Sequence, residues 1–167
     1  MVHKGKKNIL FTAFSGTSSE LLLNGFKDFP VLVLPNDKVR DSELLIETIS
    51  KAHFDYVLSF GQRPNIKDKV HVETTARDDE LRLDTSFDCE RLRRLFEQNW
   101  IPAKLSHNAG TSFCNKLYWN GLKYIEENEL ETKMVFVHVP LVKNIKDFEL
   151  FRQRIYNTLK VLEGGTI

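Results

Sequence analysis

The chain has 167 residues, about the length of one domain and enough to bury a substantial core. Hydrophobic residues make up 41% and charged residues 28%, a composition typical of soluble globular proteins that excludes a disordered chain. The 24 Lys and Arg residues nearly balance the 23 Asp and Glu residues. The resulting net charge of +1 lacks the basic excess that nucleic acid or anionic lipid would require.

The sequence also argues against a membrane or secreted protein. No apolar run approaches the roughly 20 residues of a membrane helix. The basic start at 3–7 precedes only six mostly apolar residues, whereas a secretory leader needs about 7–15, so a first strand is expected there. Two cysteines, Cys89 and Cys114, make neither a disulfide framework nor a zinc set. We therefore expect a reduced, cytoplasmic protein with one domain over residues 1–167.

Short apolar runs alternate with amphipathic stretches, which predicts strands buried on both faces and helices between them. The expected strands are 9–14, 31–34, 56–60, 70–73, 103–105 and 135–139. The expected helices are 41–51, 88–100, 112–128 and 145–162, with a polar surface loop at 76–84. This alternation predicts a three-layer α/β/α sandwich, phosphorylase/hydrolase-like, with a mostly parallel or mixed central sheet.

The segment 105–115 runs from a predicted strand through small and polar residues into a predicted helix, and it holds Cys114 in the first turn. Free N–H groups and the positive end of the helix dipole favour a thiolate there and lower its pKa. They could also stabilise an oxyanion. The alternative is that Cys114 is a small buried hydrophobic residue.

His138 lies near the end of the predicted strand 135–139, just before Pro140. The carboxyl edge of a buried strand is where open α/β sheets place ligands, so His138 is a candidate general base for Cys114. Their separation of 24 positions accommodates one helix and a βαβ-like return to the same edge. A structural histidine is the alternative interpretation.

Both segments resemble a known family. Residues 106–115, SHNAGTSFCN, are similar to the cysteine segment of pyroglutamyl peptidase I (pyrrolidone-carboxylate peptidase), and 136–140, FVHVP, to its histidine segment. Weaker similarity covers the first strand, the Gly61-Gln62 pair, the stretch 68–77 and the turn at 100–103. The resemblance runs in patches over most of the chain.

The resemblance implies a cysteine exopeptidase that removes an N-terminal pyroglutamyl residue from a small peptide, without metal or cofactor. Cys114 would be the nucleophile and His138 the base. The acidic partner, a Glu in the family, aligns best with Asp68, with Glu73 as the alternative outside the motif. The substrate-binding residues it implies are Phe14, Gln62, Phe113 and Arg77.

The sequence also departs from the family. The chain is shorter, and the loop after Phe14 lacks the family's second aromatic residue and its Asn-Pro-Ser segment. The segment 78–87 is abbreviated, and Ser112 stands where an aromatic residue is usual. Two alternatives therefore stay open: a thiol hydrolase of another small amide or ester, and an inactive relative that binds a partner. The family's habit of assembly suggests a homo-oligomer.

Other site classes find less support. No Gly-rich phosphate-binding spacing occurs, since Gly16 stands alone. The five histidines (His3, His53, His71, His107 and His138) are scattered and fit no standard metal-ligand spacing.

Overall fold

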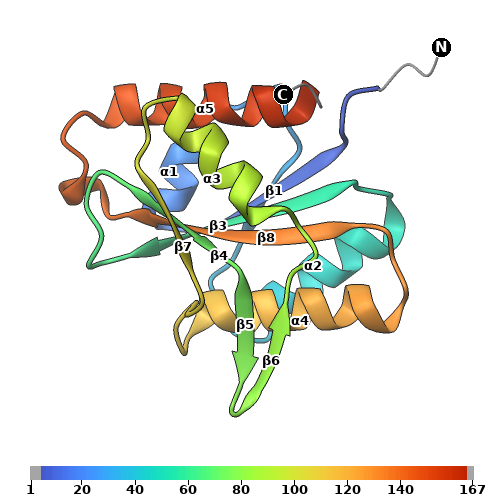
Figure 1. Ribbon diagram of the computed structural model, residues 1–167. Helices are drawn as coiled ribbons and strands as arrows, with labels where there is room; N and C mark the ends of the chain where they lie inside the picture. Colours follow the sequence, from blue (N-terminus) through green and yellow to red (C-terminus); the bar gives the residue numbers. More distant parts are fainter. Residues whose placement is uncertain (1–4, 165–167) are drawn as a thin grey trace.

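The computed structural model describes residues 5–164, so His3 of the basic start lies outside the described residues. These described residues form eight strands, five α-helices and one short 3-10 helix, η1 (Val142–Asn144) (Figure 1). The strands are β1 (Ile9–Phe14), β2 (Val31–Leu34), β3 (Tyr56–Arg63), β4 (Val70–Glu73), β5 (Thr75–Asp78), β6 (Leu81–Asp84), β7 (Ala103–Ser106) and β8 (Lys133–Pro140). The α-helices are α1 (Ser18–Leu23), α2 (Arg40–Lys51), α3 (Cys89–Gln98), α4 (Phe113–Glu127) and α5 (Phe148–Gly164). All six predicted strands and four predicted helices have a counterpart.

Six strands form one mixed sheet in the order β2-β1-β3-β8-β4-β7. Strands β2, β1, β3 and β8 are parallel, whereas β4 pairs antiparallel with β8 and parallel with β7. The mixed sheet is the one predicted. The expected parallel return from the strand at 103–105 to that at 135–139 is wrong, because β7 runs antiparallel to β8.

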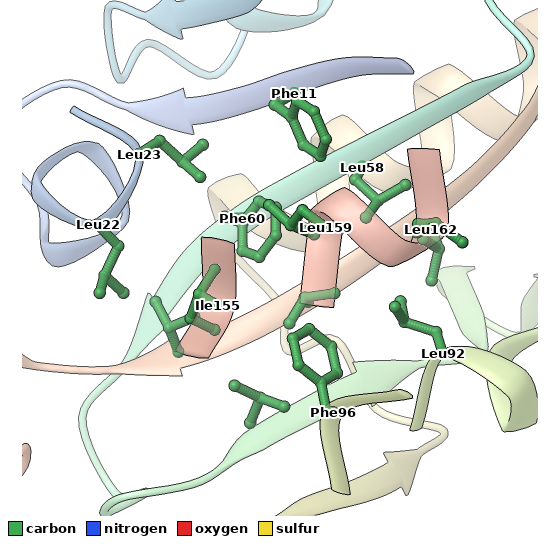
Figure 2. Packing of buried hydrophobic residues seen from close by; sticks show 14 of the residues in the cluster. Phe11, Leu22, Leu23, Leu58, Phe60, Leu92, Phe96, Ile155, Leu159 and Leu162 are labelled. Carbon is green, nitrogen blue, oxygen red and sulfur yellow. The ribbon is translucent and has the colours of Figure 1, made fainter. Parts of the chain in front are cut away.

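One face of the sheet is covered by α1, α3 and α5 (Figure 1). Figure 2 shows side chains from β3, α3 and α5 gathered in this layer, among them Phe60, Phe96 and Leu159. Each of these three is completely buried. Burying a large apolar side chain contributes about 1.5–3 kcal/mol, so this layer supplies much of the driving force for folding.

The opposite face is covered by α2 and α4, which pack against each other (Figure 1). Leu45 of α2, Leu117 and Tyr118 of α4, and Phe136 of β8 belong to this second core. Strand β8 is buried at every position from Met134 to Pro140, as the continuous apolar run predicted. Helices on both faces make this the expected three-layer sandwich.

Two elements differ from the expectation. The predicted loop at 76–84 is instead a hairpin of β5 and β6, which closes on a two-residue turn and packs against α4. Asp79 in that turn has φ +52°, a conformation that Asp tolerates better than most residues. The short helix α1 was not predicted, because six residues are too few to show helical periodicity.

Over the described range 5–164, no helix is long and apolar enough to cross a bilayer. The same residues contain no group of three or more His, Cys, Asp and Glu side chains arranged to hold a metal ion.

Candidate active site

The site lies at the carboxyl end of β8, where His138 is located. His138 is in register with Gly61 on the parallel neighbour β3 and directly opposite His71 on the antiparallel neighbour β4. Side chains alternate along a strand, so His138 shares a face with Phe136, which packs in the α2–α4 core. The imidazole therefore lies on the face that α4 covers, and it is only 3% exposed.

A buried carboxylate fixes this imidazole. Nδ1 of His138 lies 2.8 Å from Oε1 of Glu73, whose side chain is completely buried. An ionised carboxylate only accepts hydrogen bonds, so Nδ1 carries the proton and Nε2 keeps its lone pair. An imidazole held in this tautomer can take up a proton at Nε2.

Cys114 reaches the same region from α4. A side-chain Cβ placed on Gly61 would lie 2.5 Å from the Cys114 sulfur, so the sulfur occupies the space that a side chain at this position would fill. Since Gly61 and His138 are in register on adjacent strands, the thiol and the imidazole lie over neighbouring strands on one face. Within residues 5–164, no hydrogen bond joins the sulfur to His138, and such contacts are often long before substrate binds.

Burial raises the pKa of the Cys114 thiol to about 12. The Arg63 guanidinium opposes this rise and the Glu73 carboxylate adds to it. The expectation of a lowered pKa at the start of the helix is therefore wrong for this structure, because the loss of hydration outweighs the helix-end effect. The sulfur is held as a neutral thiol that needs a base.

The structure does not bring Asp68 to His138. Asp68 lies in the loop before β4, and its Oδ1 accepts a hydrogen bond of 2.8 Å from the backbone N–H of Lys146. Because β4 is antiparallel to β8 and His71 faces His138, Asp68 lies past the end of β8, where its N–H bonds Asn144. The expected contact is thus not made, and the alternative, Glu73, occupies that position.

Arg63, the last residue of β3, was missed by the sequence analysis. Its Nη1 donates to Glu73 Oε1 at 3.1 Å, and its Nη2 donates to the Asn108 carbonyl at 2.9 Å. Arg63 is two positions after Gly61, so both lie on the same face of β3. That alternation was the one available signal, and it required knowing that β3 extends three residues beyond the predicted 56–60.

Phe14 and Gln62 are both engaged inside the protein. Phe14 is only 2% exposed, and its ring centroid lies 6.4 Å from that of Phe136, so it forms part of the core. Gln62 Oε1 accepts a hydrogen bond of 3.0 Å from the N–H of Ser18, at the start of α1. Gln62 alternates with Gly61, so it lies on the face away from α4.

Phe113 and Arg77 lie closer to the nucleophile. Phe113 is half-buried as the first residue of α4, with the Lys38 ammonium 5.5 Å from its ring centroid. The backbone of Arg77 on β5 makes two hydrogen bonds with the Asn115 side chain, next to Cys114.

A cavity of about 340 Å³ adjoins the start of α4. The loop residues Gly110, Thr111 and Ser112 line one side, and Arg77 and Lys38 line the others. A substrate group seated there would lie beside the backbone that precedes Cys114.

A thiol, an imidazole and a buried carboxylate gathered on one face of an α/β/α sandwich are typical of cysteine hydrolases. Residues 85–149, which include Cys114 and His138, match the family model described as pyroglutamyl peptidase. These findings confirm that the chain resembles the pyroglutamyl peptidase family.

Two proteins of similar sequence carry the name of the same family. The chain is 33% identical to pyrrolidone-carboxylate peptidase 2 of Caldanaerobacter subterraneus over 120 residues, which are 59% of this chain and 58% of that protein. It is 30% identical to the pyrrolidone-carboxylate peptidase of Thermoanaerobacter sp. over 119 residues, 59% of each chain. The matches thus span less than two thirds of these relatives.

Solved structures confirm the fold. The pyrrolidone carboxyl peptidase from Fervidobacterium islandicum superposes with a TM-score of 0.82 at 19% identity, covering 94% of this chain and 98% of that one. Pyroglutamyl peptidase I from Bacillus amyloliquefaciens gives 0.79 at 19% identity, covering 96% and 98%.

Proposed function

We propose that this chain is a cysteine exopeptidase that hydrolyses the amide bond after an N-terminal pyroglutamyl residue. The observation that carries the proposal is the buried hydrogen bond between Glu73 and His138, on the same sheet face as the Cys114 sulfur. The names of the similar proteins supply the substrate class.

The chemistry begins with the neutral thiol. The Cys114 proton passes to Nε2 of His138, and the sulfur forms a bond to the acyl carbon of the substrate. The C–N bond then breaks, and the amine leaves with the proton from His138. A water molecule next gives a proton to His138 while its oxygen attacks the thioester carbon. The S–C bond breaks, and the sulfur regains the proton.

In this mechanism Glu73 holds the Nδ1–H of His138 and stabilises the imidazolium that forms. The backbone at the start of α4 supplies N–H groups for the oxyanion. Arg77 and Phe113 border the substrate, as the family resemblance implies. Because the mechanism requires a free thiol, we propose that the protein acts in a reducing compartment such as the cytoplasm.

A fluorogenic pyroglutamyl-coumarin amide tests the proposal. We expect the wild-type protein to release coumarin and Cys114→Ser to release none. Cys89→Ala is the matched control, because Cys89 belongs to the other core cluster and its thiol donates to the backbone carbonyl of Glu73, at 3.9 Å, so its loss should leave turnover largely intact. Release that persists in Cys114→Ser would rule out the assigned nucleophile. Mass spectrometry should detect a thioester adduct on Cys114.

A second candidate is the hydrolysis of another small amide or ester. It is favoured by Phe14 and Gln62, because the first is buried in the core and the oxygen of the second is occupied by Ser18. Turnover of other N-acyl amides, with none of the pyroglutamyl compound, would favour this candidate.

The expected self-association stays a prediction. Size-exclusion chromatography with light scattering would give the mass in solution.

A further inference from the structure

Arg63 joins two parts of the proposed site that come from different segments. It lies at the end of β3, and its guanidinium reaches over β8 to Glu73 at the end of β4. Its second nitrogen donates to the carbonyl of Asn108, in the loop that leads to Cys114. The side chain is 20% exposed, so most of it is shielded from water.

The first contact compensates a buried charge. Arg63 and His138 both donate to Oε1 of Glu73, whereas Oε2 is buried and has no partner among the described residues. A buried carboxylate is expensive unless a charged or hydrogen-bonding partner offsets its lost hydration. The Arg63 guanidinium places a positive charge 3.1 Å from this carboxylate and so offsets part of its lost hydration.

The second contact fixes the loop that carries the nucleophile. Asn108 is six residues before Cys114, and its Oδ1 accepts a hydrogen bond of 3.0 Å from the N–H of Gly110. Its own N–H donates to Ser106 Oγ at 3.2 Å. The planar guanidinium can satisfy two acceptors in a fixed geometry, so Arg63 sets the loop relative to the carboxylate.

We infer that Arg63 is a positioning residue of this site, which holds the Glu73 carboxylate against His138 and holds the Cys114 loop through the Asn108 carbonyl. The inference rests on the proposed function for its meaning in catalysis. It has a separate consequence for the thiol, because the Arg63 charge lowers the pKa of Cys114 against the effect of burial.

Other charged groups act on the same sulfur. Glu73 on β4 and Asp41 on α2 both raise the pKa of Cys114. His138 on β8 and His71 on β4 lie on the same face, and Lys38, ahead of α2, contacts the neighbouring Phe113. Among these groups, Arg63 is a cation that bonds the buried Glu73 carboxylate. Its removal should therefore raise the pKa of the Cys114 thiol.

The test is the rate of Cys114 alkylation by iodoacetamide as a function of pH, which needs no peptide substrate. Cys89→Ala serves as the background, so that one thiol is followed. Arg63→Gln should slow alkylation at least about tenfold at a fixed pH below the thiol pKa, because losing a nearby positive charge raises that pKa and leaves less of the reactive thiolate. Arg82→Gln is the control, an exposed arginine paired with Asp84 on the hairpin.

Arg63→Lys separates charge from geometry and also covers the case that Arg63→Gln does not fold. Lysine keeps the charge but cannot bridge two acceptors in one plane. We therefore expect near-wild-type alkylation, with at least a tenfold lower kcat and a smaller change in KM for the pyroglutamyl substrate. A wild-type alkylation profile in Arg63→Gln overturns the inference, as does an Arg63→Lys variant with unchanged kcat. A wild-type protein that cleaves no pyroglutamyl compound, yet shows the alkylation shift, would instead contradict the proposed function alone.

Discussion

The Cys114 sulfur lies where a side chain on Gly61 would otherwise be. A Cβ at position 61 would come within 2.5 Å of the sulfur and 2.7 Å of the Phe136 ring. Gly61 has no positive φ that would require glycine, so the close approach of these neighbours is the constraint. Gly61 is also in register with His138 on the adjacent strand. The space left by its missing side chain therefore lets the Cys114 thiol approach the imidazole.

Gly61→Ala should therefore displace the sulfur and abolish most turnover. Overpacking of this kind typically costs about 1–3 kcal/mol in the free energy of unfolding, so the variant should still fold. Chemical denaturation would measure the stability, and the coumarin assay would measure the activity. Gly5→Ala is the control, because nothing lies within 4 Å of a Cβ at that position. Full activity in Gly61→Ala would contradict the placement of the nucleophile.

Glu73 and Asp68 can be distinguished by matched amide substitutions. Glu73→Gln removes the charge beside His138 and can present an N–H to Nδ1, so kcat should fall by about 10²–10⁴-fold. Asp68→Asn should leave kcat within a few-fold of wild type, because Asp68 bonds the backbone of Lys146 instead. The reverse pattern would restore the assignment that the family alignment favours.

The sequence predicted where the site lies better than it predicted which residues form hydrogen bonds within it. Cys114 and His138 were identified from their places at a helix start and a strand end, and both local elements form as expected. The strands themselves are short apolar runs, which local sequence predicts well. Strand direction depends on long-range pairing. Because β4 runs antiparallel to β8, Asp68 lies away from His138 and Glu73 lies beside it.

The remaining errors have the same origin. Arg63 and Gly61 acquire their roles only when β3, β8 and β4 lie side by side, and no local pattern encodes that order. The thiol pKa was misjudged because burial depends on how α4 packs against the sheet. The hairpin at 75–84 is rich in charged residues and lacks the strong alternation of a half-buried strand.

Alkaline pH should destabilise the protein through its cysteines. Burial raises the pKa of both Cys89 and Cys114 to about 12. In the unfolded chain each thiol loses its proton near its ordinary pKa of 9.0, so above this pH the unfolded state binds fewer protons. The two thiols therefore cause no loss of stability below about pH 9, and the free energy of unfolding falls as the pH rises from there towards 12.

Urea denaturation at pH 7.5, 9 and 10 would measure this decline. Cys114→Ala should show a shallower decline than wild type, because one of the two buried thiols is gone. Parallel declines in the two proteins would contradict a raised thiol pKa at this position.

His71 should produce the opposite dependence at acid pH. Burial lowers its pKa, helped by Lys69 and Arg63 and opposed by Glu73, and neither ring nitrogen has a partner among the described residues. As the pH falls below the ordinary value of 6.5, the unfolded chain takes up the proton first, so stability is lost.

His71→Leu should remove that loss. Its stability at pH 7.5 should equal or exceed that of wild type, because two buried unpaired nitrogens are replaced by an apolar group. Its decline between pH 7 and 5 should be shallower in thermal or urea denaturation. His53→Gln, at a side chain 65% exposed, should keep the wild-type slope. A steeper slope in His71→Leu would contradict the lowered pKa.

Asn115 ties the β5–β6 hairpin to the nucleophile helix. Its Oδ1 accepts from the N–H of Arg77 at 3.0 Å, and its Nδ2 donates to the Arg77 carbonyl at 2.8 Å, much as a neighbouring strand would. Asn115→Ala should leave the six-stranded sheet intact while the hairpin opens more often. Hydrogen exchange at the Arg77 amide should accelerate, whereas exchange in β8 should not change. Asn120→Ala, which loses a bond from the same helix to Ser42, is the matched control and should leave the Arg77 amide protected. Equal protection of Arg77 in both variants would mean that packing against α4, rather than Asn115, holds the hairpin.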